Sequence, residues 1–91
     1  MAALLDQRAL TAAELAGVLV DLGQTRQAAI TTRAEVWRQT AHLGVTERRE
    51  ECRAHVDDLE GEVAALEQEA EALRVKLAQI DAELAWSDRG A

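Results

Sequence analysis

Apolar residues recur at alternating intervals of four and three residues through the second half of the chain, and this heptad repeat constrains the fold most. From Cys52 to Leu84 the alternation contains no slip. Spacing of this kind over more than four heptads predicts a coiled-coil helix that needs a partner helix to cover its apolar stripe. The a positions are Val56, Val63, Ala70, Leu77 and Leu84, and the d positions are Val45, Cys52, Leu59, Leu66, Leu73 and Ile80.

The heptad pattern leaves the pairing of this helix open. Valine at a with leucine at d resembles the core of a two-stranded parallel coil. However, Ala70 is too small to fill a layer of a dimer, so either the helices approach closely there or a bulky residue from elsewhere fills the gap. The flanking charges are mixed as well, since a parallel pair would bring Glu62 to Glu67. Parallel, antiparallel and bundle packing all remain open.

The first half of the chain carries a wider and less regular apolar stripe. Leu15, Leu19 and Leu22 belong to one face, and Ile30 and Trp37 continue it farther along the chain. A broad stripe predicts a helix that touches two neighbours in a bundle. We therefore expect these five residues to join the a and d residues from Cys52 to Leu84 in a dimer or bundle core, with Trp37 anchoring the hairpin or a subunit contact.

A short segment, Leu43-Gly44-Val45-Thr46, separates the two halves and is the predicted hairpin loop. Gly44 can adopt the left-handed conformation that ends a helix, and Thr46 can cap the next one. We expect helices at about 3–43 and 46–86, the first either continuous or broken at Gly23, a loop at about 43–46 and a frayed tail at 87–91. Residues 1–91 are thus predicted to form one all-α module. It is a long helical hairpin with a heptad-repeat second helix, and it dimerises into a coiled-coil or helical bundle.

The charge of the chain excludes several classes of partner. Its net charge is −7, and the excess of acidic residues lies in residues 45–91, which contain thirteen acidic and six basic residues. Because an acidic surface repels phosphates, neither nucleic acid nor an anionic membrane is an expected partner.

No apolar run approaches the roughly 20 residues of a membrane span. The chain starts without a basic signal segment and has a single cysteine, so we expect a cytoplasmic protein.

Catalytic and metal-binding patterns find no support in the sequence. No serine, histidine and acidic residue form a recognisable constellation, and no glycine-rich phosphate loop is present. Cys52 and His55 lie three residues apart, and two copies of the chain could assemble a zinc site from them. The alternative, a small core cysteine and an exposed histidine, is favoured. We therefore expect no enzyme, no cofactor, no metal and no small-molecule substrate.

The stretch around the loop resembles the N-terminal region of the antiparallel microtubule cross-linkers, the family of the protein regulator of cytokinesis, yeast anaphase spindle elongation proteins and plant microtubule-associated proteins. Val36-Trp37 matches the aliphatic-tryptophan pair of that region, Leu43-Gly44-Val45 its aliphatic-glycine step, and Glu47-Arg48-Arg49 its charged stretch. The helix from Cys52 to Leu84 would begin the acidic rod. Here the glycine follows the tryptophan after about two helical turns, whereas the family pattern has about one.

The resemblance implies a homodimerisation module that sets the geometry of two outgoing rods. It implies that microtubules are bound only by other parts of a longer protein, and a cytoskeletal location at the spindle midzone. Two alternatives stay open. The hairpin could be an adaptor that binds a helix of a different protein, or the chain could be a plain parallel stalk in which the first helix points away from the second.

Overall fold

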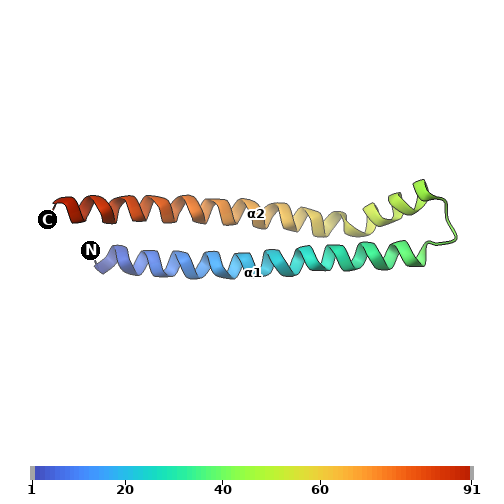
Figure 1. Cartoon of the computed structure of the whole chain (residues 1–91), viewed down its shortest axis with the longest axis horizontal. Helices are drawn as coiled ribbons and strands as arrows, with labels where there is room; N and C mark the ends of the chain where they lie inside the picture. The colour runs from blue at the N-terminus through green and yellow to red at the C-terminus, as the bar shows by residue number, and fades with distance from the viewer. Residues whose placement is uncertain (1, 91) are drawn as a thin grey trace.

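The computed structural model describes residues 2–90, which form two helices, α1 (Ala2–Gln39) and α2 (Val45–Gly90). The helices lie side by side and run in opposite directions, so both ends of the chain lie at one end of the molecule (Figure 1). The molecule is 71 Å long and 17 × 14 Å in cross-section. The all-α helical hairpin expected from the sequence is confirmed. We call the two ends of the molecule the turn end and the open end.

The heptad register of α2 determines which of its faces packs against α1. All a and d residues from Cys52 to Leu84 are buried or half-buried, and Val56 has no exposed surface. Val45, before this run, is exposed. The apolar stripe of α2 is therefore covered by α1 of the same chain.

The contact face of α1 follows a heptad register that includes threonines. Its buried residues are Thr11, Val18, Leu22, Ala29 and Val36, and its half-buried residues include Leu4, Leu15, Thr25 and Thr32. The eight core positions from Thr11 to Val36 follow one another at steps that alternate four and three. A count of apolar residues alone misses this row, because threonine is classed as polar although its methyl group packs well.

Ala70 shows how the two registers fit together. Val18 packs directly against Ala70 and Leu73, with Leu15 and Leu66 beside them. A bulky residue of α1 therefore fills the layer that Ala70 leaves open, and Ala70 is 1% exposed.

Three ion pairs connect the helices along one side of the hairpin. Arg8, Arg26 and Arg33 of α1 pair with Asp81, Glu67 and Glu60 of α2 at 2.6, 2.7 and 2.5 Å. All six side chains are about half exposed, so each pair contributes at most about 1 kcal/mol and is screened by salt. They favour the antiparallel register more than they add stability.

The turn differs in detail from the expectation. Helix α1 ends at Gln39 rather than near residue 43, and Thr40 donates its hydroxyl to the Val36 carbonyl and ends the last turn. Gly44 does not adopt a left-handed conformation, since no described residue has a positive φ. Instead the Gly44 carbonyl accepts the first hydrogen bond of α2, from the Arg48 N–H, so Gly44 is the N-cap in place of Thr46.

Two further boundaries are now defined. Helix α1 is continuous through Gly23, so no restart occurs there. Helix α2 continues to Gly90, so the residues from Ser87 that were expected to fray are helical, and residue 91 lies outside the described part. Residues 87–89 contain no helix breaker, and Arg89 in the last turn complements the negative end of the helix dipole.

Candidate association surface

The most prominent surface feature of the hairpin is a second apolar row on α1, which we call the outer stripe. Each member follows a position of the α1 core register by one residue, and the steps again alternate four and three. The row is half-exposed at Ala12 and exposed elsewhere, with Leu5 at 53% and Ile30 at 59%. The outer stripe consists of Leu5, Ala9, Ala12, Ala16, Leu19, Gly23, Arg26, Ile30, Arg33 and Trp37.

The outer stripe contains no charge without a partner. Its two charged members, Arg26 and Arg33, are those that pair with Glu67 and Glu60. Beside the stripe, Leu10 is 67% exposed and Val20 is 58% exposed. Helix α1 is therefore apolar on the face that α2 covers and on much of the surface that α2 leaves open. Such a helix is typical of the interior of a bundle rather than of a surface.

The residues expected in the bundle core divide into two groups. Leu15 and Leu22 lie with the α2 heptad residues in the core of the hairpin, whereas Leu19, Ile30 and Trp37 lie on the outer stripe. Helix α2 does not cover this second group. Of the loop residues, Leu43 is half-buried and Gly44, Val45 and Thr46 are exposed.

Trp37 is held at the turn end by Arg48. The Arg48 guanidinium lies 3.7 Å from the centroid of the Trp37 ring and also donates to the Trp37 carbonyl. Such a cation–π contact contributes about 0.5–1 kcal/mol at an exposed site. The sequence predicts that Trp37 anchors the hairpin or a subunit contact. It did not identify Arg48, because the contact depends on how the turn brings α2 back to α1.

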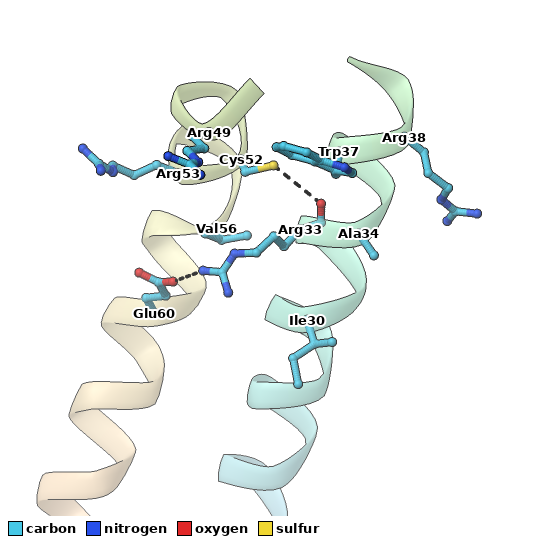
Figure 2. Close-up of a pocket in the computed structure, with 10 residues that line it drawn as sticks. All are labelled: Ile30, Arg33, Ala34, Trp37, Arg38, Arg49, Cys52, Arg53, Val56 and Glu60. Carbon is cyan, nitrogen blue, oxygen red and sulfur yellow. Dashed lines mark hydrogen bonds and ion pairs between the residues drawn. The ribbon is translucent and has the colours of Figure 1, made fainter. Parts of the chain in front are cut away.

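A cleft of about 710 Å³ opens between the helices beside Trp37. Its floor is apolar and includes Ile30, Trp37, Cys52 and Val56, and Arg33 reaches across it to Glu60 (Figure 2). Arg38, Arg49 and Arg53 lie at its rim, and Arg38 and Arg53 extend away from it on opposite sides (Figure 2). The sequence already indicated the cluster of arginines around this cleft, since five of the ten basic residues lie at positions 33 to 53.

Cys52 and His55 do not converge on a shared site in the hairpin. Cys52 is buried, and its thiol donates to the Arg33 carbonyl at 3.6 Å, whereas the His55 side chain lies 3.7 Å from Glu51 at the surface. Within residues 2–90 no group of three or more His, Cys, Asp or Glu side chains is arranged to hold a metal ion.

Neither α1 nor α2, over the residues described, contains a stretch apolar enough to cross a membrane.

Comparison with known proteins identifies no relative. No family model matches the sequence, and no curated protein and no solved structure matches the chain significantly. Function therefore has to be argued from the residues and their arrangement.

Proposed function

We propose that this chain is a homodimerisation module in which two hairpins pack through their outer stripes. The observation that carries the proposal is the outer stripe itself, a heptad-spaced apolar row of α1 that α2 does not cover. Burial of such a row removes apolar surface from water at roughly 25 cal/mol per Å². A second copy of α1 would cover it and produce a bundle of four helices.

Side-chain sizes along the outer stripe favour antiparallel contact between the two copies of α1. With a two-fold axis near Asp21, Trp37 meets the partner's Leu5 and Ile30 meets the partner's Ala12. Leu19 meets the partner's Gly23. In the same register Arg26 and Arg33 meet alanines. Each bulky residue then faces a smaller one, as close packing of a self-complementary interface requires.

Parallel contact lacks this match. It would set each residue of the outer stripe against its own copy, so that the small residues at positions 9, 12, 16 and 23 would face one another. Gaps at these layers would forfeit packing contacts. The two Arg33 guanidinium groups would also lie together and repel.

An antiparallel dimer is the arrangement that the resemblance to the microtubule cross-linkers implies. In that reading the module sets the geometry of two rods that leave in opposite directions. Microtubules would be bound by other parts of a longer protein, at the spindle midzone. Val36-Trp37 and the acidic heptad helix support this assignment. A plain stalk is the least supported alternative, because α1 folds back along α2.

The test is light scattering behind size exclusion, followed by sedimentation equilibrium. We expect a dimer for the natural sequence. Leu19→Glu and Ile30→Glu should each weaken the dimer by about a hundredfold or more, because each buries a charge without a partner in two symmetric places. Helicity measured by circular dichroism should be retained, since both residues are exposed in the hairpin.

The matched control is Gln24→Glu, which adds the same charge to α1 at an exposed position off the outer stripe. It should leave the dimer unchanged. A folded monomer for the natural sequence would contradict the proposal and leave the outer stripe as a docking face for a helix of a different protein. A dimer that tolerates both stripe variants would move the interface elsewhere.

A further inference from the structure

The cleft at the turn end carries chemistry that contact between the two outer stripes does not by itself use. Its rim presents Arg38, Arg49 and Arg53, none of which has an ion-pair partner within residues 2–90. In a chain of net charge −7 this is where cationic side chains gather around an apolar floor. A complementary occupant presents an apolar side chain and a carboxylate together.

The open end of the hairpin presents that combination. Leu5 is 53% exposed there, and Asp88 is exposed and unpaired within the described residues. Asp88 ends a row of charged residues on α2 at seven-residue spacing, which begins at Arg53. The row consists of Arg53, Glu60, Glu67, Arg74, Asp81 and Asp88. Glu60, Glu67 and Asp81 of this row pair with arginines of α1, two of which belong to the outer stripe, so the row lies on the side of the outer stripe.

Arg53 and Asp88 cannot meet within one chain. They are 35 residues apart on one helix, or about 52 Å at the helical rise. The two-fold axis inferred from the outer stripe passes α2 near Ala70, because Val18, before Asp21, packs with Ala70 and Leu73, and Arg26, after Asp21, pairs with Glu67. Arg53 and Asp88 lie 17 and 18 residues on either side of Ala70, so this axis brings Arg53 of one copy level with Asp88 of the other.

Resting on the proposed dimer, we propose that each cleft receives the open end of a second copy of this chain. The partner's Leu5 covers the apolar floor, and the partner's Asp88 pairs with Arg53. Glu67 and Arg74 come level in the same way, although Glu67 also pairs with Arg26 and Arg74 with Glu71 of its own chain. Glu60 and Asp81 would also come level, but each keeps the arginine of its own α1. The clefts of the dimer are therefore completed at both ends by the partner.

Charge reversal tests the pairing. Arg53→Glu and Asp88→Arg should each weaken the dimer several-fold, up to about tenfold, as two symmetric ion pairs per dimer are lost. The double variant Arg53→Glu/Asp88→Arg should recover the natural dissociation constant to within about threefold. Because the two positions are far apart in one chain, recovery can only come from contact between copies.

The matched control is Glu83→Arg, which makes the same charge change near the end of α2 at a position outside the charged row. Combined with Arg53→Glu it should not recover the dimer. Additive losses in the Arg53→Glu/Asp88→Arg variant, or equal recovery with Glu83→Arg, would overturn the cleft assignment while the dimer itself stands. A natural sequence that stays monomeric would overturn the proposed function, and the cleft would then fit an acidic helix of another protein.

Discussion

Thr11 is polar, yet it is only 2% exposed and occupies a core position of α1. Thr25 and Thr32 occupy equivalent positions and are half-buried, and the Thr25 hydroxyl donates to the Asp21 carbonyl of its own helix. A threonine whose hydroxyl bonds to a carbonyl of its own helix can occupy a core position. The sequence could not reveal this row, because the choice between the two adjacent stripes of α1 depends on where α2 lies.

Replacement of Thr11 tests the residue-level account. Thr11→Val keeps the branched shape and removes a hydroxyl from an apolar interface, so it should stabilise the hairpin by about 1 kcal/mol. Urea unfolding followed by circular dichroism, at one protein concentration, measures the change. Thr31→Val at an exposed position is the control and should change stability by less than about 0.5 kcal/mol. A loss of stability in Thr11→Val would mean that the hydroxyl is needed there.

At the scale of the elements, α2 was far more predictable than α1. Its heptad residues are apolar almost without exception, so one periodicity defined its buried face. Helix α1 carries two apolar rows one residue apart, and the outer row includes the exposed side chains of Leu19, Ile30 and Trp37. Sequence pattern alone therefore merged the rows into one broad stripe. The turn was located correctly, but its capping depended on backbone geometry that Gly44 and Thr46 could each have satisfied.

Substitutions at the two glycines inside α1 distinguish effects on helix stability from effects on dimerisation. A Cβ atom at Gly17 or Gly23 would meet nothing within 4 Å in the hairpin. Gly17→Ala and Gly23→Ala should therefore each stabilise α1 by up to about 1 kcal/mol, measured by thermal unfolding. With a larger side chain the two positions should differ. Gly23→Gln should weaken the dimer roughly tenfold or more by overpacking against the partner's Leu19, whereas Gly17→Gln should not. Equal effects at both positions would argue against the outer stripe as the interface.

At the scale of the whole molecule, the hairpin has a core on one face of α1 and an uncovered apolar row on the adjacent face. A two-helix hairpin of 91 residues, only 17 × 14 Å in cross-section, buries a small share of its surface by itself. Association with a second copy would supply the missing burial. The fold could be derived from the α2 heptads and the break near Gly44. The sequence could not show which apolar residues of α1 lie in the hairpin core and which lie on the outer stripe, because both groups contain the same residue types.

Disulfide pairing between two single-cysteine variants tests the central claim most directly. In a Cys52→Ala background, Ala12→Cys and Ile30→Cys place thiols at positions that face each other only across an antiparallel dimer. An equimolar mixture in a glutathione redox buffer should yield the mixed disulfide between the two variants, with little of either self-linked product. Self-linked products of each variant would establish parallel contact, and the absence of all three would exclude the outer stripe as the interface.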